Sequence, residues 1–326
     1  MPSGEDDLIA RYFRPLATAP GALGLVDDAA ILQGQGDDIV VTTDAVVEGV
    51  HFLAGDPPGT VARKALRVNL SDLAAKGATP AGFVLTLALR EAREAWLAPF
   101  AQALGEDASA FRCLLLGGDT VSTPGPLVIS ITAFGRVPAG RMVTRTGARA
   151  GDRVVVTGTI GDAALGLDVL KGGAVAQALG GETEAGAFLS GRYRVPEPRV
   201  ALAEAIRDHA SAAMDISDGL MGDLAKLCAA SGVGARIEAV SLPLSGPVRY
   251  LRDRGVVGFE TIVSGGDDYE ILCTIPGNRL DSFRKAAARA GVPVATIGEI
   301  AAGAAVPSLM DQGRELMLSR LSYSHF

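Results

Sequence analysis

Apolar strand patterns alternate with amphipathic helical patterns along most of this chain, and no other feature restricts the possible fold as strongly. In the first half, runs of β-branched and large apolar residues predict strands at 37–45, 82–90, 111–120 and 126–137, the third of which runs into a glycine-rich turn. Apolar residues at helical spacing predict helices at 63–78 and 91–108. In the first helix, Leu66, Leu70 and Leu73 share one face and are expected in the core.

The second half repeats the alternation. Its pattern predicts a strand, a glycine turn and a helix over 153–167, a turn leading into a helix over 213–232, and a helix near 279–291. Both halves therefore belong to the α/β class, with some mixed α+β character, and neither contains a short repeat or a low-complexity segment.

Residues 140–152 separate the two halves, because they are rich in glycine and arginine and follow neither the helix period nor the strand period. A chain of 326 residues is also longer than one typical hydrophobic core supports. We therefore predict an N-terminal α/β domain at 1–139 and a C-terminal α/β domain at 140–326.

Charge and composition exclude several classes of protein. The net charge is −7 and no basic patch stands out, so nucleic acid is not expected as a partner. The acidic start lacks the apolar core of a signal peptide, and runs such as FVLTLAL are far shorter than the ~20 residues of a membrane span. Cys113, Cys228 and Cys273 are isolated and odd in number, which fits reduced thiols in a cytoplasmic protein.

Aspartates sit where apolar elements end. In VTTDAVVEGVHF, residues 41–52, a strand pattern delivers Asp44 and then His51, one of three histidines in the chain. Similar placements recur at Asp27, Asp28, Asp72, Asp119, Asp215, Asp218, Asp267 and Asp268. Any one of these is more often a helix cap or a turn residue, and a lone histidine is more often an ordinary interior one. The repetition is what favours a shared site.

Convergence of these carboxylates would require cations. Two unit charges ~4 Å apart repel by about 4 kcal/mol at an effective dielectric constant near ~20. On the first predicted helix, Asn69, Asp72 and Lys76 are spaced i, i+3, i+7 and form a stripe along the rim of the core. Thr42 and Thr43 add hydroxyls, while no cysteine or histidine cluster is present. An all-oxygen ligand set indicates a hard cation, and Mg²⁺ is favoured over Ca²⁺ because the chain has no EF-hand spacing.

The usual phosphate-binding motifs are missing. The chain contains no GxxxxGK[ST] loop and no protein-kinase motif set. VVVTGTIGDAALG, residues 154–166, has the order strand, glycine turn and helix but not the GxGxxG spacing, so we interpret it as a structural turn. A nucleotide site in this protein must therefore be of an unusual type.

A set of motifs resembles one known family. The motifs are DDAAIL, TTDAVVEGVHF, KALRVNLSDLAAKGATP, LLLGGDT, RTGARAGD, VTGTIGDAALGL, MDISDGL, SGGDDYE and SYSHF. In this order, from residue 27 to the C-terminus, they resemble the thiamine-monophosphate kinase family, which belongs to the superfamily of aminoimidazole ribonucleotide synthetase and selenophosphate synthetase.

The resemblance implies a fold and an activity. The fold is the two-domain type of that superfamily, with an N-terminal mixed sheet and helices that hold the metal and ATP site and form a homodimer. The C-terminal α/β domain adds metal and substrate contacts. The activity is transfer of the γ-phosphoryl group of ATP to thiamine monophosphate, giving thiamine diphosphate and ADP, with several Mg²⁺ ions between the substrates.

The resemblance also implies residue roles, which would otherwise stay open. The implied metal ligands are Asp28, Thr42, Thr43, Asp44, Asp72, Asp119, Asp215 and Asp218. The implied ATP contacts are Phe111, Gly118, Asp119, Arg145 and Ser217. The implied contacts to thiamine monophosphate are His51, Asp267 and Tyr323. Without the resemblance, Arg145 could equally be a solvated arginine of the linker.

Three positions depart from the family pattern. Val26 stands where glycine usually precedes the paired aspartates, and Phe111 stands where tyrosine is common. Asp267 replaces a frequent glutamate and has one methylene less reach. None of these changes removes a metal ligand, although Val26 is expected to alter the loop that presents Asp28.

Direct in-line transfer is the expected mechanism. A phosphate acceptor is already ionised near neutral pH, with a second pKa of about 6, so no general base is required. Three alternatives stay open: another ATP-dependent synthetase of the superfamily, a catalytically silent Mg-nucleotide-binding relative, and a structural dimer whose acids are only caps and turns. Release of ADP that depends on thiamine monophosphate would separate the kinase activity from all three alternatives.

Overall fold

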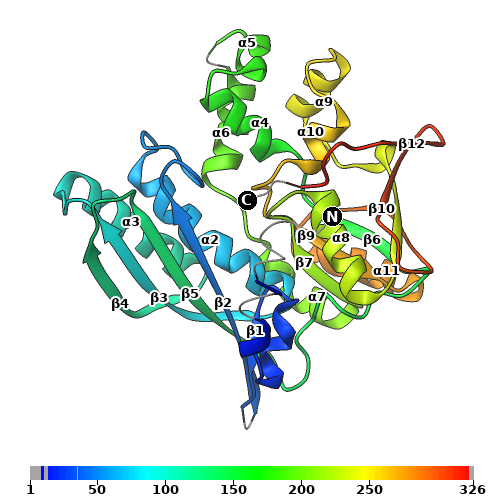
Figure 1. Ribbon diagram of the computed structural model, residues 1–326, viewed down its shortest axis with the longest axis horizontal. Helices are drawn as coiled ribbons and strands as arrows, with labels where there is room; N and C mark the ends of the chain where they lie inside the picture. The colour runs from blue at the N-terminus through cyan, green and yellow to red at the C-terminus, as the bar shows by residue number, and fades with distance from the viewer. Residues whose placement is uncertain (1–8, 11–13, 35, 182, 323–326) are drawn as a thin grey trace.

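The computed structural model describes residues 9–10, 14–34, 36–181 and 183–322, which form two β-sheets with helices around them (Figure 1). The first sheet has five strands in the order β1-β2-β5-β3-β4. They are β1 (Ala30–Leu32), β2 (Asp37–Val47), β3 (Thr79–Leu89), β4 (Leu114–Ser122) and β5 (Val128–Pro138). The pairing of β3 with β4 is parallel and the other pairings are antiparallel, so the sheet is mixed, as the family resemblance implied.

Helix α2 (Pro58–Ala75) is the central element of the molecule. It contacts β2 and β5 of the first sheet on one side and β7 and β9 of the second sheet on the other (Figure 1). Leu66, Leu70 and Leu73 are fully buried, which confirms the predicted core face. Helix α3 (Glu94–Ala110) packs beside α2. Because α2 faces both halves, the polar side chains on its rim lie where the halves meet.

The second sheet has seven strands in the order β12-β11-β8-β10-β6-β9-β7. They are β6 (Arg153–Thr157), β7 (Ala212–Asp215), β8 (Gly234–Glu238), β9 (Ile271–Ile275), β10 (Val294–Ala301), β11 (Ser308–Asp311) and β12 (Arg314–Leu316). The helices of this half are α4 (Asp162–Leu170), α5 (Ala174–Leu179), α6 (Glu184–Arg194), α7 (Ala203–His209), α8 (Leu220–Ser231), α9 (Gly246–Asp253), α10 (Phe259–Ser264) and α11 (Leu280–Arg289). Short 3-10 turns lie at Arg14–Leu16, Pro20–Leu25, Val200–Leu202, Ala239–Ser241 and Gly277–Arg279.

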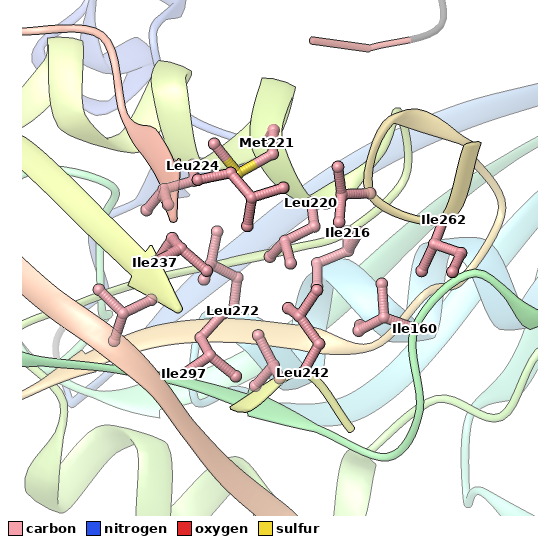
Figure 2. Packing of buried hydrophobic residues seen from close by; sticks show 14 of the residues in the cluster. Ile160, Ile216, Leu220, Met221, Leu224, Ile237, Leu242, Ile262, Leu272 and Ile297 are labelled. Atoms are coloured by element: carbon pink, nitrogen blue, oxygen red, sulfur yellow. The ribbon is translucent and has the colours of Figure 1, made fainter. Parts of the chain in front are cut away.

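Each half has its own core, and a third cluster joins them. In the second half, Leu220 and Leu224 of α8 pack with Ile237, Leu272 and other residues between the helices and the sheet (Figure 2). The joining cluster includes Ala74 and Ala75 at the end of α2 together with residues of β6, α7, β9 and α11. Buried apolar contacts therefore hold α2 firmly between the two halves.

Residues 139–152 contain no helix and no strand, and they connect β5 to β6. This is the segment where we predicted the domain boundary, and the boundary itself stays a prediction. None of the described helices is long and apolar enough to cross a membrane.

The predicted glycine-rich turn at the end of the third strand is wrong. Gly117, Gly118 and Asp119 lie inside β4 and pair with β3. Gly118 has a packing reason to be glycine, because a Cβ atom there would lie 1.9 Å from the carbonyl oxygen of Leu85. The sequence pattern of two glycines before an aspartate is typical of turns, and close strand pairing is what overrides it.

Helix α4 approaches α6 so closely that only glycine fits at one position. A Cβ atom on Gly166 would lie 2.0 Å from the carbonyl oxygen of Leu189, whereas one on Gly105 of α3 would meet nothing within 4 Å. We expect Gly166→Ala to lower the free energy of unfolding by roughly 1–3 kcal/mol, because the helices must separate. Gly105→Ala should instead stabilise by about 0.5–1 kcal/mol through helix propensity. Urea melts of both variants measure the difference, and equal effects would contradict the packing.

Candidate functional site

Three carboxylates from distant parts of the chain converge where the two halves meet. Asp28 precedes β1, Asp72 projects from α2, and Asp215 is the last residue of β7. One oxygen from each lies within 4.8 Å of the others. The predicted convergence of acids is therefore present in the structure for these three residues.

Two further predicted residues lie against this group. Thr42, on the inner face of β2, donates a hydrogen bond to Asp72 Oδ2. The backbone N–H of Asp44 donates to Asn69 Oδ1 at 3.2 Å, which joins β2 to α2. Asn69 and Asp72 thus occupy the rim of α2 that the i, i+3, i+7 spacing predicted. The name acid cluster is used below for Asp28, Asp44, Asp72 and Asp215.

Burial and mutual repulsion disfavour charge in most of the acid cluster. Burial raises the pKa of Asp72 well above its usual value, and the neighbouring Asp215, Asp44 and Asp28 raise it further. Asp215 is shifted in the same direction, first by burial and then by Asp28. Burial together with Asp28 and Asp218 raises the pKa of Asp44 to about 6. The group therefore has a strong electrostatic need for added positive charge.

Two basic side chains supply part of that positive charge, and both of them pair with Asp28. Lys76 Nζ forms ion pairs with Asp27 Oδ1 at 2.8 Å and with Asp28 Oδ2, and it donates to the Ala213 carbonyl at 2.9 Å. Arg145 pairs with Asp28 Oδ1, and its backbone N–H donates to Asp27 Oδ2 at 2.7 Å. Burial opposes charge on Asp28, but Arg145 and Lys76 outweigh it and lower its pKa to about 2.

A pocket of 730 Å³ opens beside the acid cluster, between the two halves. Residues Asp44–Val46, Gly49–His51 and Val68 line it from the first half, and Ser217, Asp218 and parts of 164–175 and 256–269 supply most of the opposite wall. His51 Nδ1 accepts a hydrogen bond from the Val47 N–H at 3.0 Å, which places the proton of a neutral imidazole on Nε2. Two predicted substrate residues, His51 and Asp267, thus line one pocket.

The segment that carries Asp267 has an unusual backbone. Asp267 and Tyr269 have φ angles of 73° and 49°, in the left-handed region that non-glycine residues rarely adopt. Their N–H groups donate to the carbonyls of Ser217 and Ile216, both at 2.8 Å. Backbone strain of this kind persists only where the surroundings hold it, and here it aims Asp267 into the pocket.

A buried aspartate that our sequence reasoning did not single out shapes the adjoining turn. Asp223 Oδ2 accepts hydrogen bonds from the N–H groups of Ser217, Asp218 and Gly219 at 3.0, 3.0 and 3.2 Å. This arrangement presents Ser217 and Asp218 to the pocket. Lys226 pairs with Asp218 at 2.5 Å. The sequence DGLMGD contained a signal for Asp223, because an aspartate in the first turn of a helix can accept hydrogen bonds from the N–H groups that precede the helix.

Four predicted residues, Thr43, Phe111, Gly118 and Asp119, are not brought to the acid cluster, and Gly118 lies beside Asp119 in β4. Thr43 lies on the opposite face of β2, where its hydroxyl bonds Ile131 O at 3.1 Å and Thr132 Oγ1 at 3.0 Å. Asp119 is exposed on the edge strand β4. Phe111 packs on the core of the first half under the guanidinium group of Arg67, with 5.3 Å to the ring centroid. The alternation of strand side chains explains Thr43, because its neighbour Thr42 takes the inward position.

Two remaining predictions concern the ends of the chain. Tyr323 lies outside the described residues. Val26, the departure before the paired aspartates, has φ −116° and ψ 7°. A negative φ is open to any residue, so the backbone at Val26 has no need of glycine; the effect of Val26 on the Asp28 loop stays a prediction.

The donor chemistry of the acid cluster fits a hard divalent cation. Carboxylate oxygens with a threonine hydroxyl alongside are oxygen ligands only, and the raised pKa values of Asp72 and Asp215 indicate excess negative charge. Asp44 of the acid cluster also lines a pocket large enough for a small organic molecule.

Comparison with known proteins gives consistent matches over the whole chain. Residues 26–137 match the family model "AIR synthase related protein, N-terminal domain", and residues 149–307 match "AIR synthase related protein, C-terminal domain". A thiamine-monophosphate kinase from Caulobacter vibrioides is 48% identical, with 99% of this chain and 91% of that protein covered.

Solved structures agree. The structure described as AaThiL complexed with AMPPCP and TMP is 30% identical with a TM-score of 0.84, and the match covers 99% of this chain and 96% of that one. A thiamine-monophosphate kinase from Stenotrophomonas maltophilia is 38% identical with a TM-score of 0.76, over 93% and 94% of the two chains.

Neutralising Asp44 tests the electrostatic account of the acid cluster. Because its pKa is raised to about 6 in the folded protein, its contribution to stability is present at low pH and is lost as pH rises through about 6. Without divalent cations, Asp44→Asn should therefore raise the free energy of unfolding at pH 7 by roughly 1–3 kcal/mol and change it little at pH 4. Denaturant melts with a chelator measure this, and Asp253→Asn on α9 is the exposed control. An equal effect of Asp44→Asn at both pH values would contradict the account.

Proposed function

The chain belongs to the thiamine-monophosphate kinase family of AIR synthase related proteins, and on that premise we propose that it transfers the γ-phosphoryl group of ATP to thiamine monophosphate. The products are thiamine diphosphate and ADP. The observation that carries the proposal is the acid cluster beside the 730 Å³ pocket between the two halves, which Asp44 of the cluster lines. A relative of the same fold, AaThiL, is complexed with AMPPCP and TMP, which supports the same pair of ligands for this protein.

Mg²⁺ is the cation that the acid cluster would hold. Asp28, Asp72, Asp215 and Asp44 with the Thr42 hydroxyl are the proposed ligands, and Asp218 faces the same pocket from its other wall. When bound, Mg²⁺ would offset repulsion between the phosphate groups of the two substrates. The raised pKa values of Asp72 and Asp215 support this assignment, because such carboxylates gain most from a nearby cation.

Thiamine monophosphate would occupy the pocket, with its phosphate toward the acid cluster. Its thiazolium ring is cationic, and Asp267 gives the pocket wall a negative charge that suits it. His51 also lines this pocket, and in its neutral tautomer the ring proton lies on Nε2. The acceptor phosphate is ionised near neutral pH, so these residues need only to bind and orient it, and none acts as a general base.

Arg145 and Ser217 are proposed to contact ATP. Arg145 has an additional donor for a phosphate, since its Nε atom is buried and has no hydrogen-bond partner among the described residues. Burial opposes its charged form, but Asp28 raises its pKa so that the guanidinium stays charged. Ser217 stands on the turn that Asp223 holds beside the acid cluster.

A homodimer explains the residues that the single chain leaves apart. β4 is an edge strand, and its residues Leu114, Leu115 and Leu116 are 60%, 53% and 65% exposed. An unpaired apolar edge of this kind favours association with another sheet. Asp119 pairs with Thr86 on β3, and the order β2-β5-β3-β4 puts it three strand spacings from β2, roughly 14 Å.

That separation is too large for Asp119 and Asp44 of one chain to hold the same ion. We propose that Asp119 of the partner subunit completes the metal site of this chain at β2, on the side where Thr42 meets Asp72. In this arrangement Phe111, Gly118 and Asp119 act on nucleotide bound to the neighbouring chain.

The three cysteines are all free and buried, in agreement with a reducing compartment, and we propose the cytoplasm.

Removing one charge from the acid cluster tests the activity. Asp72→Asn keeps the side-chain volume but deletes the carboxylate that faces Asp28, Asp215 and Thr42. We expect at least about a 10³-fold loss of thiamine diphosphate formation from ATP and thiamine monophosphate, with no loss of folding. Product separation by chromatography measures turnover, and Asp253→Asn should keep wild-type activity. Near-normal turnover by Asp72→Asn would contradict the assignment of the acid cluster as the reaction centre.

Mixed dimers test the shared site. Asp119→Asn and Asp72→Asn should each be inactive alone, because each dimer would then lack a ligand in both sites. When the two variants are refolded together, mixed dimers would contain one intact site, and up to about a quarter of wild-type activity should return. Failure to recover activity, with mixed dimers shown by mass spectrometry, would rule out a partner role for Asp119.

A further inference from the structure

A buried lysine lies directly behind the wall of the substrate pocket. Lys64 projects from α2, and its side chain is 1% exposed. It does not line the pocket itself, so it has no direct route to the substrate. Lysine is almost never fully buried unless its ammonium group has partners, and the partners of Lys64 connect the two residues proposed to hold thiamine monophosphate.

The first partner is the turn that carries His51. Lys64 Nζ donates to the His51 carbonyl at 2.8 Å, and the hydroxyl of Tyr193 donates to the same oxygen at 3.0 Å. Tyr193 belongs to α6, and the ammonium group of Lys64 lies 3.8 Å from the centre of its ring. The His51 carbonyl thus accepts hydrogen bonds from Lys64 of α2 and from Tyr193 of the second half.

The second partner is Asp267. Lys64 Nζ lies 3.3 Å from Asp267 Oδ1, on the segment with the left-handed backbone. Asp56 adds negative charge nearby, and Arg194 of α6 binds it at 2.6 Å, which ties the turn after His51 to the second half again. One ammonium group therefore reaches the pocket residue of each half.

We propose that Lys64 is a positioning residue of the substrate pocket, whose ammonium group sets the distance between His51 and Asp267. The inference rests on the proposed function, since it assigns the effect to binding of thiamine monophosphate. An apolar side chain of similar length would fill the same space without the cost of removing a charge from water. The charge of Lys64 is therefore explained by its contacts to His51 and Asp267. Binding of ATP, which uses other residues, should not depend on this charge.

Lys64→Met tests the proposal, because it removes the charge and keeps the length. We expect the KM for thiamine monophosphate to rise at least about tenfold, the typical effect of losing hydrogen bonds to a charged group, while the KM for ATP changes less than twofold. Calorimetric titration of thiamine monophosphate in the presence of a non-hydrolysable ATP analogue gives the same comparison without turnover. Lys285→Met, an exposed lysine on α11, is the control for the substitution itself.

Tyr193→Phe is the second variant, should Lys64→Met not fold. It keeps the ring beneath the ammonium group and removes one of the two donors to the His51 carbonyl. It should raise the same KM by a smaller factor. A wild-type protein that makes no thiamine diphosphate would refute the proposed function. Wild-type turnover with an unchanged KM for thiamine monophosphate in both variants, or equal rises for both substrates, would overturn the role of Lys64 alone.

Discussion

Repulsion between buried carboxylates is the constraint on which the rest of the structure depends. Asp28, Asp72 and Asp215 bring oxygens within 4.8 Å of one another, and Asp72 and Asp215 are buried. Such a group can exist only if protons, basic side chains or bound cations offset the charge. Lys76 and Arg145 serve one corner, and the others keep raised pKa values. The same imbalance that weakens the protein without cations is what would draw divalent ions and polyphosphate to this place.

Helix α2 turns that constraint into a site. Its apolar face packs on the first sheet, and its C-terminal end belongs to the cluster that joins the two halves. The polar residues of the site lie along the rim between these two contacts. Asn69 and Asp72 face β2 and the acid cluster, Lys76 neutralises the loop of Asp28, and Lys64 reaches the far side of the pocket. Because one rigid element positions all four, a shift of α2 would alter the proposed metal, nucleotide and substrate contacts together.

Sequence patterns predicted the elements well where period and burial agreed. The strand of Asp44 and the helix of Asp72 were found where expected, because alternation and leucine spacing there match burial on one face. The pattern was misleading for Gly118, where glycines read as a turn prove to be needed for close strand pairing. The role of Asp223 was missed, and so was the pairing of Lys76 and Arg145 with Asp28, because that pairing depends on partners that are far away along the chain.

By itself, the sequence determined which elements form and which carboxylates end them, since local propensity and periodicity act over a few residues. It also carried the motifs of its family. Only the tertiary structure decided which of those acids meet. Thr42 and Thr43 are neighbours, yet the pleat of β2 sends one to Asp72 and the other to the opposite face. Asp119 is as acidic as Asp72, yet strand order alone keeps it on an exposed edge. Contacts between distant segments depend on packing and chain topology, which no local pattern encodes.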